Sequence, residues 1–131
     1  MKPLWQSRKQ AEDTADRLRK FGQPMRLMIL SLLLQGEKSV SEIDTATGIG
    51  QPGLSQQLAE LRRAELVTTR RQAKQVFYSI ADQSVELCVR SIEAVFGGGD
   101  PRHAPHLGVK PLNAPSKSDA VAGAANFVRI L

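Results

Sequence analysis

Residues 25–34 constrain the fold of this chain more than any other segment. Eight of these ten residues are apolar, Met25 and Met28 among them, and they are spread around the whole circumference of a helix. A helix that is apolar on nearly every side needs neighbours on nearly every side, so we expect this segment to be the central core helix of a small domain. Pro24 suits the first turn of this helix, and Gly36 is suited to end it.

The chain is predicted to contain one folded domain and a tail. Its 131 residues are enough for one compact domain plus an appendage. The part that begins at Gly97 holds four of the seven prolines and few large apolar residues, which is typical of disorder. We therefore expect a domain over residues 1–96 and a disordered, Gly/Pro/Ala-rich C-terminal tail over residues 97–131.

Four further helices and a hairpin are predicted around the core helix. The helices are expected at residues 6–21, from Ser41 to a break at 47–50, at 52–64, and at 83–96 after a capping Asp82, with strands at 66–70 and 76–80. The polar, basic segment 71–75 is expected to form the tip of the hairpin. The predicted fold class is therefore mainly α with a small β-hairpin, in the order of a winged helix-turn-helix.

Charge and composition narrow the function classes. The net charge of +5 favours an acidic partner such as nucleic acid. The single cysteine, Cys88, excludes an intrachain disulfide and fits a reducing cytoplasm, where we expect the protein to act. No apolar run approaches the roughly 18 residues that span a membrane, so no membrane partner is expected. Both histidines, His103 and His106, lie in the predicted tail, and no Gly-rich phosphate loop follows a strand, so no enzymatic activity is expected.

The second helix of the predicted helix-turn-helix pair carries side chains suited to reading DNA. In this motif the N-terminal residues of the second helix reach base edges in the major groove, and glutamine matches the paired donor and acceptor of adenine. The residues expected to contact bases are Gln51, Ser55, Gln56 and Gln57. The residues expected to contact the DNA backbone, from the end of this helix and the hairpin, are Arg62, Arg63, Arg70, Arg71 and Lys74. The sequence thus predicts double-stranded DNA as the partner.

Three segments in order resemble the signatures of the ArsR/SmtB family of repressors. FGQPMRLMIL at residues 21–30 is similar to the opening of the family's domain, QPGLSQQLAELR at 51–62 to its recognition helix, and LVTTRRQAKQVFYS at 66–79 to its wing. The resemblance covers about residues 8–96 and is strongest to the NolR/HlyU-like branch. Gln57 stands where the family usually carries histidine.

The resemblance implies a repressor that binds an inverted-repeat operator as a homodimer. It also implies that the first and last helices pair across the dimer, so that the two half-sites lie about one DNA turn (~34 Å) apart. The residues expected at this dimer interface are Leu18, Val85, Val89, Ile92 and Phe96.

The sensing sites that such a family implies have lost their ligands in this chain. One metal site of the family uses cysteines where this chain has Ser39 and Ser41, and hydroxyls are poor ligands for such metals. Of a second site only Asp82 remains, and its other positions hold Ser84, Val95 and Gly98. A cysteine pair that senses oxidants is replaced by Ser31 and Gly97. No metal, cofactor or intrachain disulfide switch is therefore expected.

Three alternatives stay open at this point. A winged helix can also bind another protein, and in that case the C-terminal tail is expected to act as a docking peptide. A DNA-binding protein without sequence preference would show a steep salt dependence and little response to base changes. A thiol-responsive repressor would act through Cys88, which is otherwise expected to be a small, buried apolar residue.

Overall fold

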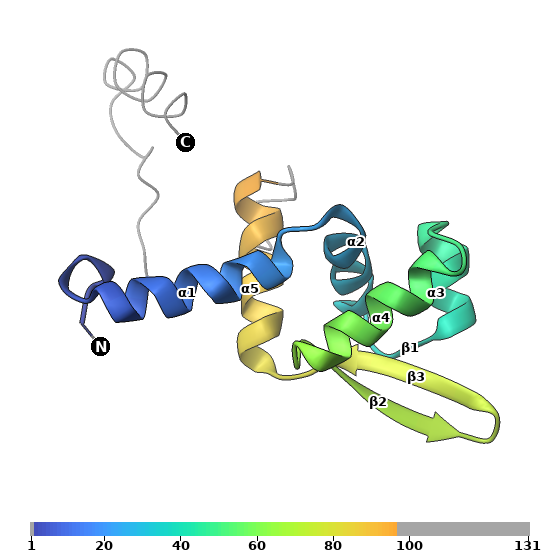
Figure 1. Cartoon of the computed structure of the whole chain (residues 1–131). Helices are drawn as coiled ribbons and strands as arrows, with labels where there is room; N and C mark the ends of the chain where they lie inside the picture. Colours follow the sequence, from blue (N-terminus) through green and yellow to red (C-terminus); the bar gives the residue numbers. More distant parts are fainter. Residues whose placement is uncertain (1, 97–131) are drawn as a thin grey trace, which may run out of the picture.

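The computed structural model describes residues 2–96 and contains every predicted helix and strand (Figure 1). The elements are η1 (Leu4–Gln6, a 3-10 turn), α1 (Arg8–Phe21), α2 (Pro24–Leu33), β1 (Lys38–Ser39), α3 (Val40–Thr47), α4 (Gly53–Arg63), β2 (Val67–Gln72), β3 (Gln75–Ile80) and α5 (Gln83–Phe96). The predicted fold class is confirmed, whereas the predicted tail, residues 97–131, lies outside the described residues. None of the described helices combines the length and apolar character needed to cross a membrane.

Helix α2 lies at the centre of the domain, as predicted. It touches α3, α4, α5 and β3, and its residues Ile29 and Leu30 are fully buried. The prediction was wrong for Met25 and Met28, which are 42% and 45% exposed. Both lie on a side of α2 that the other described elements leave open, so α2 has fewer neighbours than its sequence indicates.

The hairpin belongs to a three-stranded antiparallel sheet with the order β1-β3-β2. Strands β2 and β3 pair along their whole length, and their last pair is Gln72 with Gln75. The turn therefore consists of two residues, 73–74, instead of the predicted tip at 71–75. Strand β1 was not predicted, because two residues are too few to show the alternation of a strand.

Side-chain caps fix the starts of α1, α3 and α5, and at α1 the Ser7 Oγ accepts from Gln10 N at 3.2 Å. Glu42 N donates to Ser39 Oγ at 3.2 Å, and Ser39 N donates to Glu42 Oε1 at 2.9 Å, which together form a capping box. Ser39 is therefore the residue that begins α3, which corrects the prediction of Ser41. Asp82 caps α5 as predicted, since Val85 N donates to its Oδ1 at 3.0 Å.

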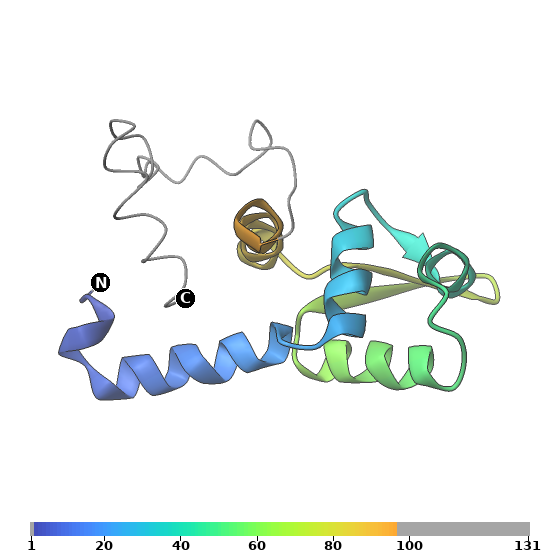
Figure 2. The same ribbon diagram turned by 90° about the horizontal axis from the view of Figure 1, so that it is seen from above.

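Helix α1 extends away from the body formed by α2, α3, α4 and the sheet (Figures 1 and 2). Its one buried residue is Phe21, in the last turn. In α5, Val85 and Val89 are 7% and 1% exposed and belong to the core of the protomer itself, which corrects the prediction that they face a partner. The large apolar side chains that α1 and α5 do expose are Leu18, Leu87, Val95 and Phe96.

Candidate nucleic-acid interface

A tight turn sets the direction of α4 relative to α3. Gly48 ends α3 with a left-handed backbone (φ 69°), a conformation that glycine adopts at low cost. Asp44 holds both sides of this turn. Its backbone carbonyl accepts from Gly48 N at 2.8 Å, and its Oδ1 accepts from Gly50 N at 2.9 Å. The turn therefore leaves α4 (Figure 1, green) packed on one side and open on the other.

Helix α4 has one apolar side and one polar side. Its apolar side is buried against the core and consists of Leu54, Leu58 and Leu61. Ser55 and Gln56 lie in its first turns and are exposed, and Arg62 and Arg63 are exposed in its last turn. The helix thus presents amide and hydroxyl groups near its N-terminus and guanidinium groups near its C-terminus, on the side away from the core.

The structure brings two of the predicted base-contacting residues together. Gln51 Oε1 accepts hydrogen bonds from Ser55 N at 3.1 Å and from Ser55 Oγ at 2.6 Å. Gln51 therefore caps the first turn of α4, a role that its sequence position did not reveal. Both side chains are exposed, so water or a DNA base edge can replace this contact.

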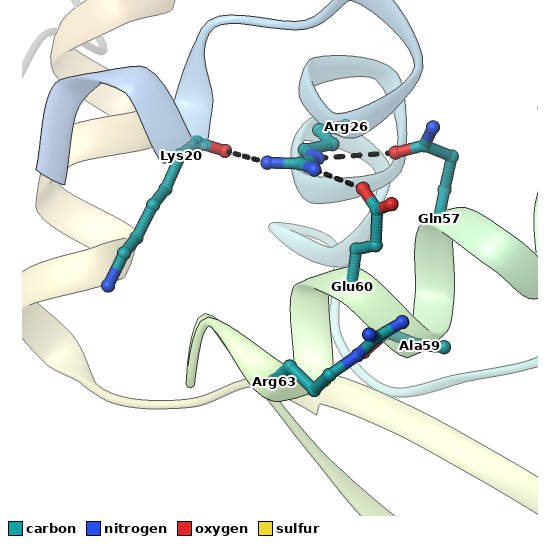
Figure 3. A network of polar contacts seen from close by, with 6 residues as sticks. All are labelled: Lys20, Arg26, Gln57, Ala59, Glu60 and Arg63. Carbon is teal, nitrogen blue, oxygen red and sulfur yellow. Dashed lines mark hydrogen bonds and ion pairs between the residues drawn. The ribbon is translucent and has the colours of Figure 1, made fainter. Parts of the chain in front are cut away.

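Gln57 is turned away from the exposed side of α4. Its Oε1 accepts a hydrogen bond from Arg26 Nε at 3.2 Å, and Arg26 also forms an ion pair with Glu60 (Figure 3). Gln57 is half-buried, whereas its neighbour Gln56 is exposed. The structure therefore corrects the expectation that the Gln57 side chain points outward for a base contact.

The two adjacent arginines of β2 have different surroundings. Arg70 donates to Glu37 through Nε at 3.0 Å and Nη2 at 2.6 Å, and its guanidinium lies 4.8 Å from the centroid of the Phe77 ring. The hydrogen bonds from Arg70 hold the pKa of the Glu37 carboxyl below its ordinary value. Arg70 thus has an acidic partner within the protein, and its predicted contact with the DNA backbone stays a prediction. Among residues 2–96, Arg71 has no ion pair or side-chain hydrogen bond, and it is exposed.

Two open grooves lie between the helix-turn-helix and the sheet. One is lined by Ser55 and Arg62 of α4 and Tyr78 of β3, among others. The other lies between α3 and the hairpin and includes Gln51, just before α4, and Lys74, at the turn of the hairpin. The segment that leads into α4 and the hairpin turn therefore line one groove.

Cys88 is exposed, which corrects the prediction of a small buried residue. It lines a groove together with Leu18 and Phe21 of α1, because the face of α5 that bears it is turned toward α1 and not toward the core. In the part of the chain that the structure describes, no group of three or more His, Cys, Asp or Glu side chains lies close enough together to hold a metal ion.

A helix-turn-helix followed by a two-stranded basic wing defines this chain as a winged helix-turn-helix protein, a class that binds DNA. The chain belongs to the arsR family of bacterial regulatory proteins. The family's model matches residues 23–69, which run from the start of α2 into β2. The family resemblance expected from the three sequence segments is thereby confirmed.

Relatives with known names are regulators of transcription. A biofilm growth-associated repressor from Xylella fastidiosa is 41% identical over 88 residues, which cover 67% of this chain and 77% of that protein. The crystal structure of NolR from Sinorhizobium fredii matches with a TM-score of 0.63 at 34% identity, over 76% of this chain and 100% of NolR. The homodimeric winged helix-turn-helix domain of Mb0332 from Mycobacterium bovis matches with a TM-score of 0.59 at 34% identity, over 68% and 84% of the two chains. The relatives are regulators, which confirms the prediction that the chain is not an enzyme.

Proposed function

We propose that this protein is a repressor that binds an inverted-repeat operator as a homodimer. The observation that carries the proposal is the exposed surface shared by the start of α4 and the hairpin. Ser55 lines one groove with Arg62 and Arg63 of α4, and Gln51, just before α4, lines a second groove with Lys74 of the hairpin. A regulator that binds chromosomal DNA in this way acts in the cytoplasm.

Base reading is assigned to the first turns of α4. The exposed amide of Gln56 can donate to and accept from one base edge, as adenine N6 and N7 require. Gln51 and Ser55 bond each other in the free protein and can exchange that contact for one with a base. These three residues are the proposed specificity determinants. Gln57 is not among them, because its side chain bonds to Arg26.

Backbone contacts are assigned to four exposed cations that form no ion pair among residues 2–96. Arg62 and Arg63 are exposed at the end of α4, and Arg71 and Lys74 are exposed at the outer part of the hairpin. Contacts with phosphates orient the protein on the duplex and supply most of the salt-dependent affinity.

We assign the dimer interface, where a second copy of the chain binds, to the exposed apolar side chains of α1 and α5. Leu18 of α1 is 61% exposed and Phe96 of α5 is 81% exposed, and Leu87 and Val95 of α5 are exposed as well. Several large apolar side chains exposed on two helices are typical of an interaction site. From the predicted interface, Leu18, Ile92 and Phe96 remain in the proposal, and the homodimeric relative Mb0332 supports it.

The proposal is tested by selecting duplexes from a random-sequence pool with the wild-type protein and measuring affinities for the selected operator and for random DNA. Gln56→Ala should weaken operator binding about 10-fold or more, the equivalent of one bidentate base contact, and leave random DNA nearly unchanged. The matched control is Gln83→Ala, an exposed glutamine at the start of α5. Enrichment of no sequence would contradict operator binding and favour a protein-interaction module.

A further inference from the structure

We propose that Arg26 is a positioning residue that fixes the recognition helix α4 relative to α1, and thereby sets the spacing between the two DNA half-sites. The inference rests on the proposed function, because it assigns α4 to base reading and α1 to the dimer. Arg26 itself lies on α2 and is not on the proposed DNA surface. Its side chain is 13% exposed.

One guanidinium joins three segments of the chain (Figure 3). Arg26 Nε donates to Gln57 Oε1 at 3.2 Å, and Nη2 pairs with the Glu60 carboxylate, so that two of the contacts are with α4. The third contact is from Nη1 to the backbone carbonyl oxygen of Lys20, in the last turn of α1, at 3.1 Å. The planar fork of an arginine can hold three such acceptors in one geometry, which a lysine cannot do.

On the α4 side, the contacts with Arg26 restrain the rotation of the helix. Gln57 and Glu60 are three residues apart and therefore lie on the same flank of α4, beside its buried leucines. The buried leucines set which side of α4 faces the core. The directional hydrogen bonds and the ion pair of Arg26 add a restraint on one flank of the helix, and thereby on the direction in which Ser55 and Gln56 point.

On the α1 side, Arg26 closes a gap in the helix end. The carbonyls in the last turn of a helix have no partner within the helix. Here the carbonyl of Arg19 accepts from Gly22 N at 3.2 Å, that of Phe21 accepts from Gln23 N at 2.9 Å, and that of Lys20, between them, accepts from Arg26. Because Phe21 is the only buried residue of α1, the contact with Lys20 is one of the few attachments of α1 to the body.

These contacts make Arg26 a direct link between α1, one of the two helices proposed for dimerisation, and α4, the helix proposed for base reading. In a symmetric dimer the separation and the angle of the two α4 helices depend on how each α4 is held relative to α1. A dimer with this link intact should accept one spacing of half-sites and reject others. Without the link, the same two reading surfaces should tolerate a range of spacings.

The experiment compares operators of natural spacing with operators that carry two inserted base pairs at the centre, which rotate the half-sites by about 70°. Wild-type protein should bind the natural spacing strongly and the altered one weakly. Arg26→Lys should reduce this ratio about 10-fold, the equivalent of one lost charge-assisted hydrogen bond. Affinity for random DNA should stay as in the wild type, because Arg26 is not assigned to a phosphate and lysine keeps the positive charge. Arg8→Lys is the matched control, since Arg8 pairs with Glu12 on the exposed surface of α1.

A second variant, Gln57→Met, tests whether Gln57 positions α4 through Arg26 or contacts a base itself. It also replaces Arg26→Lys as the test if that variant does not fold. Positioning predicts a relaxed spacing requirement with the same preferred bases. A changed base preference with unaltered spacing selectivity would overturn the inference and return Gln57 to base reading. So would an Arg26→Lys protein that keeps the wild-type spacing ratio. A wild-type protein that does not distinguish operator from random DNA would instead refute the proposed function.

Discussion

Arg70 and Arg71 are adjacent in β2, but we expect only the removal of Arg71 to change the salt dependence of DNA binding. Successive residues of a strand point to opposite faces. Arg70 is held by Glu37 and lies over Phe77, whereas Arg71 has no partner among residues 2–96. Arg71→Ala should therefore remove a DNA phosphate contact from each protomer. Arg70→Ala should remove the contacts with Glu37 and with the Phe77 ring, and no phosphate contact.

The magnitude follows from counterion release. The slope of log K against log salt is about −0.9 for each phosphate that a protein neutralises on duplex DNA. A dimer with Arg71→Ala loses two such contacts, so its slope should be shallower by about 1.8. Between roughly 50 and 200 mM salt, the wild type should then lose about 12-fold more affinity than the variant.

The assay is fluorescence anisotropy with a labelled operator duplex, titrated with wild type, Arg71→Ala and Arg70→Ala at five or more salt concentrations, about 50 to 200 mM. Arg70→Ala should keep the wild-type slope. Equal slopes for all three proteins would refute the assignment of Arg71 to a phosphate. A shallower slope for Arg70→Ala alone would mean that Arg70 leaves Glu37 when DNA binds, and that the wing contacts phosphate through the other face of β2.

Three further predictions concern stability and assembly. Ser39→Ala should lower the free energy of unfolding by about 0.5–2 kcal/mol in urea titrations, because Ser39 caps α3, whereas Ser41→Ala should have little effect. The pKa of Asp82 is lowered from its ordinary 3.8, chiefly by the hydrogen bond from the Ser84 hydroxyl. The stabilisation by Asp82 is therefore present above pH 3.8 and lost as the pH falls through the lower folded-state pKa, so the difference in urea midpoint between wild type and Asp82→Ala should shrink in acid. Leu18→Glu should halve the mass seen by light scattering, and an unchanged mass would count against the dimer surface.

Periodicity and turn residues in the sequence were enough to predict the α-helices and the hairpin of this fold, but not strand β1, and they left the partner of each side chain open. Gln56 and Gln57 have the same chemistry and were predicted alike. Only the packing of α4 on α2 places Gln57 beside Arg26 and leaves Gln56 exposed. Glu37 and Arg70 are 33 residues apart, so no local pattern could reveal that they pair.

The same limit applies to the apolar residues of α5. Its sequence shows more apolar residues than one small core needs, and this excess correctly indicated an exposed apolar surface. Val85 and Val89 belong to the core while Leu87 and Val95 are exposed. This division depends on the rotation of α5, which is set by contacts with α2 and β3 and not by α5 alone.

The exposure of α1 links the helix content of the protein to its concentration. A helix of 14 residues is marginal in water without tertiary support, and in the protomer Phe21 alone is buried. If the second copy covers the exposed apolar residues of α1, this helix is fully stabilised only in the dimer. The far-UV helical signal should then fall on dilution through the concentration range where the dimer dissociates. Below that range the amount of dimer varies with the square of the protein concentration. Repression would then switch on sharply as the protein accumulates in the cell, with no need for a bound corepressor.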